Sequence, residues 1–214
     1  TGRLAMKDAL STTMSDNTGW SSELATTWRY YTPPSRPSFH DLAGIQRLVR
    51  SLRHEQQRRE INLLILGSTS EYRELAFRER LNSTVVDVSA GYHESISTEL
   101  VHVPRQERVV HQLWQELDLP REAFDLALGD LVVGNLQPSQ LDSFLERLHG
   151  CMRPGGLFVT KSFIELGAHP PRRVEDWNTI LNQVEVGDLF TEIAYDITVM
   201  LCDPHTRKVT FSEM

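Results

Sequence analysis

The sequence predicts an α/β fold, in which a mostly parallel sheet carries helices on both faces and ends in an antiparallel hairpin. Three observations support this prediction. From residue 61 onward, short apolar runs alternate with amphipathic stretches. The run INLLILG at 61–67 is apolar throughout, as a central strand of a parallel sheet is. Near the end, IAYDITVMLCDPHTRKVTF at 193–211 places a DPHT turn between two apolar runs, which predicts the hairpin.

The first element with a predicted structure follows a polar leader. Residues 1–19 lack the apolar core of a signal peptide and contain two methionines, Met6 and Met14. We expect this stretch to be disordered, processed or of artificial origin, and a natural start at Met14 is compatible with the sequence.

Residues 20–60 form a second segment, in which aromatic residues precede three prolines. Its aromatic side chains either pack across the core or, as Trp28, Tyr30 and Tyr31, form a lid over a ligand. Within the segment, apolar residues recur with helical spacing and predict an amphipathic helix over 41–60: Ile45, Leu48, Val49 and Leu52. The arginines of this helix are expected to form its solvated face.

Residues 61–214 are predicted to be one ligand-binding α/β domain. After the strand at 61–67 we expect a helix over 71–81, and helices at 138–152 and 174–185. Further strands are expected at 83–89, within 105–114, at 123–130 and at 156–163. The sequence RPGG at 153–156 predicts a turn between a helix and the last of these strands.

Ligands of open parallel sheets bind at the carboxyl ends of the strands, so the loop at 67–71, Asp87 and Asp130 should meet. Asp87 follows Gly67 by 20 residues, an interval typical of a carboxylate that accepts ribose hydrogen bonds. The loop has one glycine where dinucleotide loops have three, and Glu71 would repel a diphosphate. These features favour a cationic nucleoside ligand. Ser68 and Glu71 also fit a capping box, and this role does not exclude ligand contact through the same loop.

The pattern LLILGSTSE, VVDVS, LWQELDLPREAFDLALGD and LERLHGCMRPGGLFVTKSF resembles the class I, Rossmann-like methyltransferases that use S-adenosylmethionine. The resemblance covers residues 61–163, and its narrower features resemble a bacterial subgroup with an LG-x-T-x-E loop. It implies a doubly wound sheet with S-adenosylmethionine as cofactor. The cofactor-binding residues that it implies are Gly67, Ser68, Thr69, Glu71, Asp87, Val88, Leu113, Trp114, Asp130 and Leu131.

The sequence departs from the family pattern at several of these positions. Ile65 stands where the family has an acidic residue, and Thr69 and Glu71 replace the second and third glycines. Leu113 falls near the position of an acidic residue beside adenine. Adenine would then be held by apolar packing and backbone groups.

For catalysis, the candidates are Asp130, Tyr31 and Asn135, with Asp130 as the preferred general base. Methyl transfer to a small molecule is the favoured reaction, and much of the catalysis would come from orientation and exclusion of water. Two alternatives stay open. One is a cyclase or lyase of the same fold that releases methylthioadenosine, with the aromatic lid stabilising the sulfonium. The other is a degenerate, non-catalytic binding protein.

Composition and charge narrow the choice of partners. The 214 residues carry a net charge of −7, which argues against a broad surface for nucleic acid or an anionic membrane. Cys151 and Cys202 have neither zinc-like spacing nor a disulfide framework, so we expect the cytoplasm and no metal. The expected partner is a small-molecule substrate, and a homodimer is compatible with the sequence. The chain lacks the glycines that a nicotinamide-dependent dehydrogenase needs. It contains neither the G-x-S-x-G elbow of a hydrolase nor a P-loop.

Overall fold

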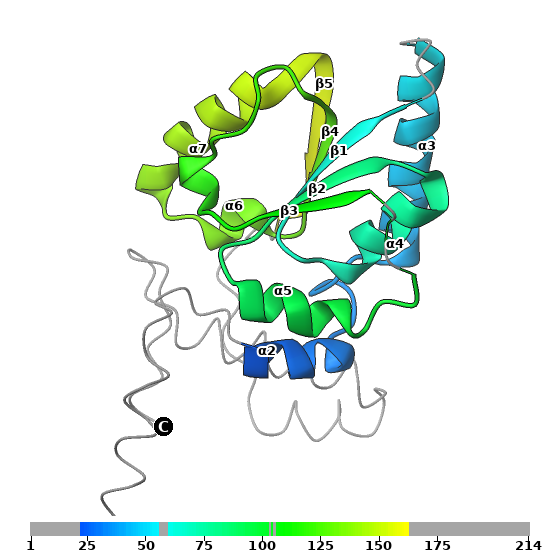
Figure 1. Cartoon of the computed structure of the whole chain (residues 1–214), viewed down its shortest axis with the longest axis vertical. Coiled ribbons are helices and arrows are strands. Elements are labelled where there is room, and N and C mark those ends of the chain that lie inside the picture. The colour runs from blue at the N-terminus through cyan, green and yellow to red at the C-terminus, as the bar shows by residue number, and fades with distance from the viewer. Residues whose placement is uncertain (1–21, 56–59, 103, 105, 163–214) are drawn as a thin grey trace, which may run out of the picture.

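The computed structural model describes residues 22–55, 60–102, 104 and 106–162 (Figure 1). The polar leader 1–19, the predicted helix at 174–185 and the predicted C-terminal hairpin lie outside the described residues. The elements are α2 (Ser22–Thr27), η1 (Trp28–Tyr30), α3 (Phe39–Glu55), β1 (Asn62–Leu66), α4 (Ser70–Glu79), β2 (Asn82–Val86), α5 (Ala90–Ser97), β3 (Glu107–Val110), η2 (Trp114–Glu116), β4 (Phe124–Gly129), α6 (Val132–Asn135), α7 (Pro138–Cys151) and β5 (Met152–Thr160).

The described strands form one parallel sheet in the order β3-β2-β1-β4-β5, which confirms the predicted α/β class. The strand order reverses between β1 and β4, since the chain moves from β1 outward to β2 and β3 and then returns to β4. Leu66 at the end of β1 is in register with Val86 of β2 and with Gly129 of β4. The loops that follow these three strands therefore start side by side at the switch point, where ligands bind in open α/β sheets.

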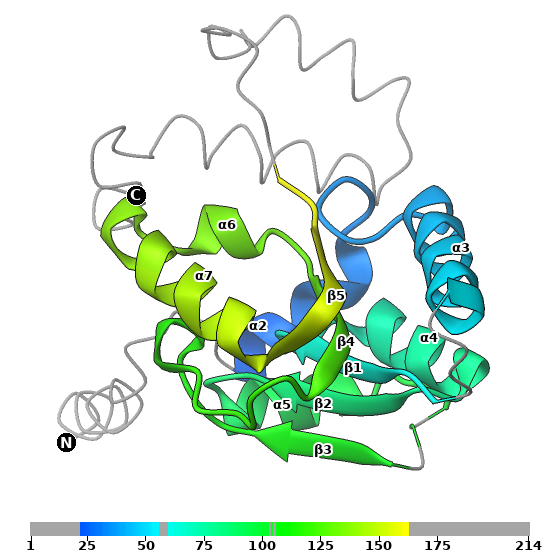
Figure 2. The ribbon, with the colours of Figure 1, turned by 90° about the horizontal axis from the view of Figure 1, so that it is seen from above.

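Two apolar layers enclose the sheet, and the alternation of side chains along β1 assigns its residues to one or the other. Leu63 and Ile65 join the cluster under α3 and α4, whereas Leu64 and Leu66 join the cluster under α6 and α7. Figure 2 shows these two pairs of helices on opposite sides of the sheet. Burial on both faces explains why β1 is apolar throughout, and it fixes the strand ends that carry the site.

The helices predicted at 41–60, 71–81 and 138–152 correspond to α3, α4 and α7, whereas two strands end or begin at other residues than expected. The strand expected within 105–114 ends at Val110, so Leu113 and Trp114 lie beyond the sheet. The turn expected at 153–156 belongs to the irregular start of β5, where Gly155 has φ of 76° and the register against β4 shifts between Phe124 and Leu126. A bulge accommodates the glycines within the strand.

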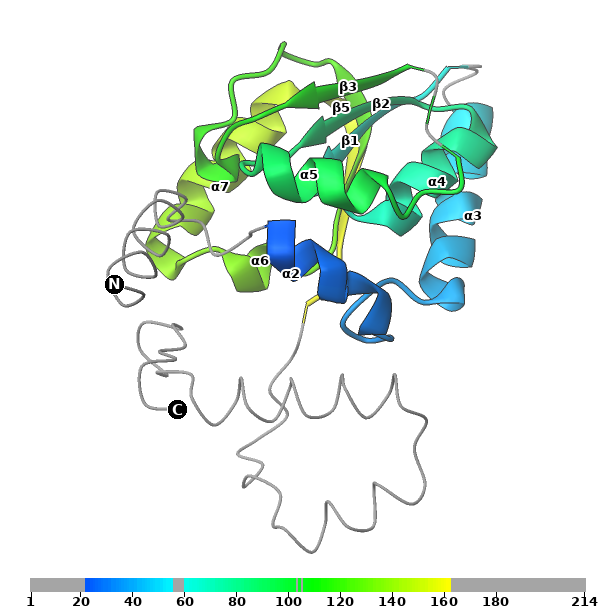
Figure 3. The same ribbon diagram turned by 60° about the horizontal axis from the view of Figure 1, so that its bottom comes forward.

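The segment before β1 covers the ligand-binding edge and one side of the sheet. Ala25 of α2 packs with Tyr92 and Ile96 of α5, and Trp28 adjoins this small cluster. Figure 3 shows α2 lying along α5 below the sheet, while α3 runs beside α4. In the part of the chain that the structure describes, no helix has the length and hydrophobicity required to cross a membrane.

Candidate functional site

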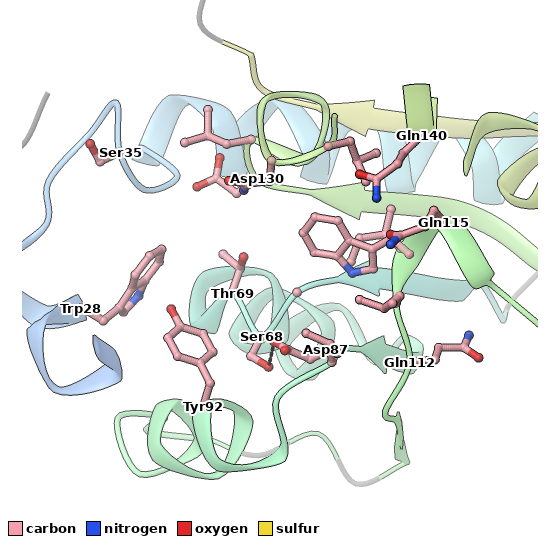
Figure 4. A pocket seen from close by; sticks show the side chains of 18 residues that line it. Trp28, Ser35, Ser68, Thr69, Asp87, Tyr92, Gln112, Gln115, Asp130 and Gln140 are labelled. Carbon is pink, nitrogen blue, oxygen red and sulfur yellow. Dashed lines mark hydrogen bonds between the residues drawn. The ribbon is translucent and has the colours of Figure 1, made fainter. Parts of the chain in front are cut away.

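A cavity of about 230 Å³ lies at the carboxyl ends of β1, β2 and β4 (Figure 4). The residues that line it come from the end of β1, from the loops after β1, β2, β3 and β4, from η1 and the loop after it, from η2, and from α5, α6 and α7. They are Trp28, Ser35, Leu66, Gly67, Ser68, Thr69, Asp87, Val88, Tyr92, Gln112, Leu113, Trp114, Gln115, Asp130, Leu131, Asn135, Leu136 and Gln140.

The loop after β1 depends on the conformational freedom of Gly67. Its φ is 89°, a backbone conformation that residues other than glycine rarely adopt. Its N–H donates to the carbonyl of Val86 at 2.8 Å, and the indole Nε1 of Trp114 donates to the same carbonyl at 3.1 Å. A Cβ at position 67 would stand 3.4 Å from the Trp114 ring. The single glycine thus lets the loop turn beside β2 and lie against the indole.

Asp87 follows β2 and is buried, with only 6% of its surface exposed. Its Oδ2 accepts from the Ser68 hydroxyl at 2.6 Å, and its Oδ1 accepts from the Ser89 N–H at 3.0 Å. Burial raises the pKa of Asp87, although these two hydrogen bonds oppose the shift. A carboxylate has about four acceptor positions, so two remain for a ligand.

His93 of α5 completes a buried hydrogen-bonded group with Ser68 and Asp87. Its Nδ1 lies 3.0 Å from the Ser68 Oγ. Because that hydroxyl donates its proton to Asp87, the His93 Nδ1 must carry a hydrogen and donate. Burial, with a smaller contribution from Arg73, lowers the pKa of His93 to about 4, so the ring is neutral at pH 7. His111 donates from its Nδ1 to the Asp87 carbonyl at 3.1 Å.

Glu71 does not line the cavity, and the predicted capping box is wrong. The cap residue of α4 is Thr69, which makes no side-chain capping bond, and the Ser68 hydroxyl is turned to Asp87. Glu71 instead pairs with Arg36 from the loop after η1 and accepts from the Ser70 hydroxyl at 3.0 Å. Its negative charge is neutralised by a residue of the N-terminal segment, so it does not offer a free carboxylate to a cationic ligand.

The predicted aromatic lid is only partly placed at the cavity. Trp28 lines it and donates from Nε1 to the Ser70 hydroxyl at 3.2 Å. The Tyr31 ring lies next to that of Trp28, with ring centroids 5.9 Å apart, and does not line the cavity. Tyr30 is 46% exposed and stacks with Arg29. The structure thus argues against Tyr31 as a catalytic residue, because its side chain is not among those that line the cavity.

Asp130 and Leu131 follow β4 and line the cavity, as does Asn135 of α6. The Asp130 side chain is only 4% exposed, and the Lys161 Nζ lies 2.9 Å from its Oδ1. Although this is an ion-pair distance, neither carboxylate oxygen has a partner in hydrogen-bond geometry. Burial raises the pKa of Asp130 to about 6 against the influence of Lys161. Leu131 has φ of 56°, a left-handed conformation that turns the chain directly into α6.

The structure adds lining residues that sequence reasoning missed, among them three glutamines. Gln112 and Gln115 flank the predicted pair Leu113 and Trp114, so their place in the loop after β3 offered a signal. Ser35 and Gln140 offered none, since both reach the cavity from distant segments. Figure 4 shows Trp28, Ser35 and Asp130 at one end of the cavity and Gln115 and Gln140 at the other, with Asp87 between.

Metal ligands are not grouped in this region. Across residues 22–55, 60–102 and 106–162, no set of three or more His, Cys, Asp or Glu side chains is placed to hold an ion.

Comparison with known proteins gives the site a context. The model of a methyltransferase domain family matches residues 65–160, from β1 to the end of β5. This stretch is a methyltransferase-like domain. The match covers less than half of the 214 residues; it supports a methyltransferase-like transferase and implies S-adenosylmethionine as the cofactor of this domain. No curated protein is significantly similar to the chain.

Two solved structures are similar to this chain, and the first of them shares the fold of the methyltransferase-like domain. A putative S-adenosylmethionine-dependent methyltransferase from Methanococcus maripaludis has 12% identity and a TM-score of 0.52, over 70% of this chain and 67% of its own. The PH0226 protein from Pyrococcus horikoshii OT3 has 17% identity and a TM-score of 0.44, over 63% of this chain and 60% of its own. The chain thus spans about two-thirds of the lengths of these structures. At such identities the first likeness concerns the fold and carries nothing about substrate.

Proposed function

We propose that this chain transfers a methyl group from S-adenosylmethionine to a small molecule. One observation carries the proposal: the loop after β1, the Asp87 carboxylate after β2 and the Asp130 carboxylate after β4 line a single cavity in a methyltransferase-like domain. When bound, the cofactor supplies a methyl group already activated by a positively charged sulfur. The protein therefore has to bind, orient and exclude water, and these are tasks for which a partly enclosed cavity is suited.

The residues present fit such a cofactor. The two unused acceptor positions of the Asp87 carboxylate match the two hydroxyls of a ribose. At the end of the cavity that holds Gln115 and Gln140, Leu113 and Trp114 offer apolar contacts for adenine. The Gln115 amide can form hydrogen bonds with the polar edge of the base. Gly67 to Thr69 would hold the methionine part.

The opposite end of the cavity would receive the acceptor. Asp130 is our candidate for the general base, because burial raises its pKa towards the range in which a carboxylate takes up a proton near neutral pH. Asn135 lies on the same wall and would orient the acceptor through its amide.

The cyclase alternative gains less support. Its aromatic enclosure would use Trp28, Tyr30 and Tyr31 together, but only the Trp28 ring lines the cavity. The other aromatic residues that line the cavity, Tyr92 and Trp114, lie outside the predicted lid, and aromatic walls suit a sulfonium ligand of either reaction, so they do not favour cyclisation.

The test has two stages. Isothermal titration calorimetry should show binding of S-adenosylmethionine and S-adenosylhomocysteine; no binding of either would favour a non-catalytic protein. Mass spectrometry after incubation with S-adenosylmethionine and candidate acceptors should then find S-adenosylhomocysteine as the nucleoside product. Formation of methylthioadenosine without any acceptor would instead establish the cyclase or lyase reaction.

Three finer expectations belong to this proposal. The LG-x-T-x-E subgroup rests on the sequence pattern around Gly67, Thr69 and Glu71. A cytoplasmic location is supported by Cys151, a buried free thiol. The partners we propose are a small-molecule substrate and, as a possible assembly, a second copy of the chain, with neither nucleic acid nor membrane.

A further inference from the structure

The Asp130 carboxylate lies at the acceptor end of the cavity with the Lys161 ammonium 2.9 Å from its Oδ1, but without the well-directed donors that a buried carboxylate normally has. Its side chain is 4% exposed, and neither oxygen is engaged in hydrogen-bond geometry. By contrast, Asp87 accepts from Ser68 and Ser89. Buried carboxylates without donors cost free energy, so a ligand that supplies N–H groups at this point would bind favourably.

A primary ammonium already stands beside this carboxylate. The Lys161 Nζ lies 2.9 Å from the Asp130 Oδ1, directly after β5, and its side chain is 22% exposed. The site therefore admits an alkylammonium group at ion-pair distance. The Lys161 Nζ is itself buried and, like the Asp130 oxygens, has no partner in hydrogen-bond geometry, so a ligand ammonium with better geometry can take its place while the partly exposed Lys161 side chain turns to solvent.

The other charged groups near this end are already paired within the described residues. Glu71 is paired with Arg36, and Asp41 accepts from the N–H and the hydroxyl of Ser38. Both acids act on Asp130 by repulsion. An anionic acceptor would stand beside the Asp130 carboxylate itself, whereas a cationic one replaces Lys161 without changing the charge balance.

We propose that the acceptor of this site is an amine, which binds as its ammonium to Asp130 in exchange for Lys161. The inference rests on the proposed methyl transfer and names the class of its substrate. Trp28 and Ser35, at the same end of the cavity in Figure 4, complete the surroundings with an aromatic ring and a hydroxyl. Aromatic rings attract ammonium groups, and a neutral alcohol gains nothing comparable.

The transfer step balances with the groups at hand. One ammonium N–H proton passes to the Asp130 carboxylate, which leaves the nitrogen with a lone pair. That pair forms the new N–C bond while the S–C bond breaks and its electrons remain on sulfur. The product leaves as an N-methylammonium, and the Asp130 proton returns to solvent. With its pKa raised to about 6, Asp130 is a better proton acceptor than an exposed aspartate.

Binding of three matched probes tests the proposal: benzylamine, benzyl alcohol and benzoate, each titrated calorimetrically at pH 7.5 with saturating S-adenosylhomocysteine. Wild-type protein should bind benzylamine at least tenfold more tightly than either of the others. Asp130→Asn should abolish this preference. Lys161→Gln removes the internal competitor and should tighten benzylamine binding several-fold while the affinity for S-adenosylhomocysteine stays within twofold.

Several results would overturn the inference. Equal binding of the three probes would do so, as would a preference for benzoate, which would make Lys161 the recognition group. Loss of benzylamine binding in Lys161→Gln would do the same. Asp130→Asn could also weaken the binding of S-adenosylhomocysteine but not of methylthioadenosine, which lacks the amino acid group. Asp130 would then bind the ammonium of the cofactor instead of the acceptor. A wild-type protein that binds neither nucleoside overturns the proposed function as well, whereas nucleoside binding without ammonium preference overturns this inference alone.

Discussion

Arg36 and Glu71 form an ion pair that ties the loop after η1 to the first turn of α4. The side chains are 24% and 13% exposed, respectively. Arg36 also donates to the Trp28 carbonyl at 3.3 Å, and its guanidinium carbon lies 5.4 Å from the centre of the Trp28 ring. A residue of the predicted nucleotide loop thus positions the aromatic wall of the cavity.

Breaking this ion pair should loosen the Trp28 wall. We expect Glu71→Gln and Arg36→Met each to lower the free energy of unfolding by about 1–2 kcal/mol, because a hydrogen-bonded, half-buried charge loses its partner. Binding of S-adenosylhomocysteine should weaken several-fold. Urea unfolding and calorimetry measure the two effects. The matched control is Arg29→Met, since Arg29 donates to Tyr30 at the surface. Strictly additive effects in the Arg36→Met/Glu71→Gln double variant would show that the two residues are not coupled.

The Asp87 carboxylate should contribute directly to cofactor affinity. Asp87→Ala removes acceptors for two ribose hydroxyls, so binding of S-adenosylmethionine should weaken by ~1–3 kcal/mol, or about fivefold to 150-fold. Asp118→Ala changes an exposed carboxylate outside the cavity and serves as control. Unchanged affinity in folded Asp87→Ala would refute the ribose assignment.

The strand ends of the site were predictable because local sequence determines them. Gly67, Asp87 and Asp130 each end an apolar run, and parallel strands bring such ends to one edge of a sheet. The sequence pattern therefore identified the wall of the cavity that the strands build. It also identified Leu113 and Trp114, although the strand before them is shorter than expected.

The partners of these residues were not predictable, because they come from distant segments. Ser68 and Glu71 fit a capping box by spacing, but His93 and Arg36 offer them tertiary hydrogen bonds that replace it. Arg36 is 35 residues from Glu71 in the sequence. The prolines around Arg36 predict a turn, but they do not indicate which carboxylate it will pair with. Likewise Lys161 meets Asp130 only because β5 lies next to β4.

Gly129 is required where β4 passes into the turn before α6. A Cβ there would stand 2.1 Å from the Val132 Cγ2 and 3.2 Å from the Leu66 Cβ. We expect Gly129→Ala to destabilise the protein by about 1–3 kcal/mol through overpacking, as measured by urea unfolding, and to weaken cofactor binding because Asp130 shifts. Gly134→Ala is the matched control: its Cβ meets no atom within 4 Å, so stability should rise slightly or stay unchanged. Equal effects at the two positions would contradict this reading of the packing.

His93 should make stability depend on pH on the acid side. Its pKa is about 4 in the folded protein against an ordinary 6.5, so the unfolded chain takes up the proton first as the pH falls. The neutral His93 contributes fully to the free energy of unfolding above pH 6.5. About 2 kcal/mol of this contribution is lost when the pH falls from 7.5 to 5. Asp87 acts in the opposite direction, because its raised pKa favours the folded state as the pH falls. The comparison must therefore be between wild type and His93→Asn, whose amide can keep the bond to Ser68.

The free energy of unfolding of both proteins can be measured with urea at pH 7.5 and pH 5. Between these pH values it should fall by about 2 kcal/mol less in His93→Asn than in wild type. His149→Asn, at an exposed position of α7, should follow wild type. Parallel losses in wild type and His93→Asn would mean that His93 titrates normally in the folded protein. The hydrogen bond from its Nδ1 to Ser68 would then not depend on a neutral ring, since a protonated imidazole donates from the same nitrogen.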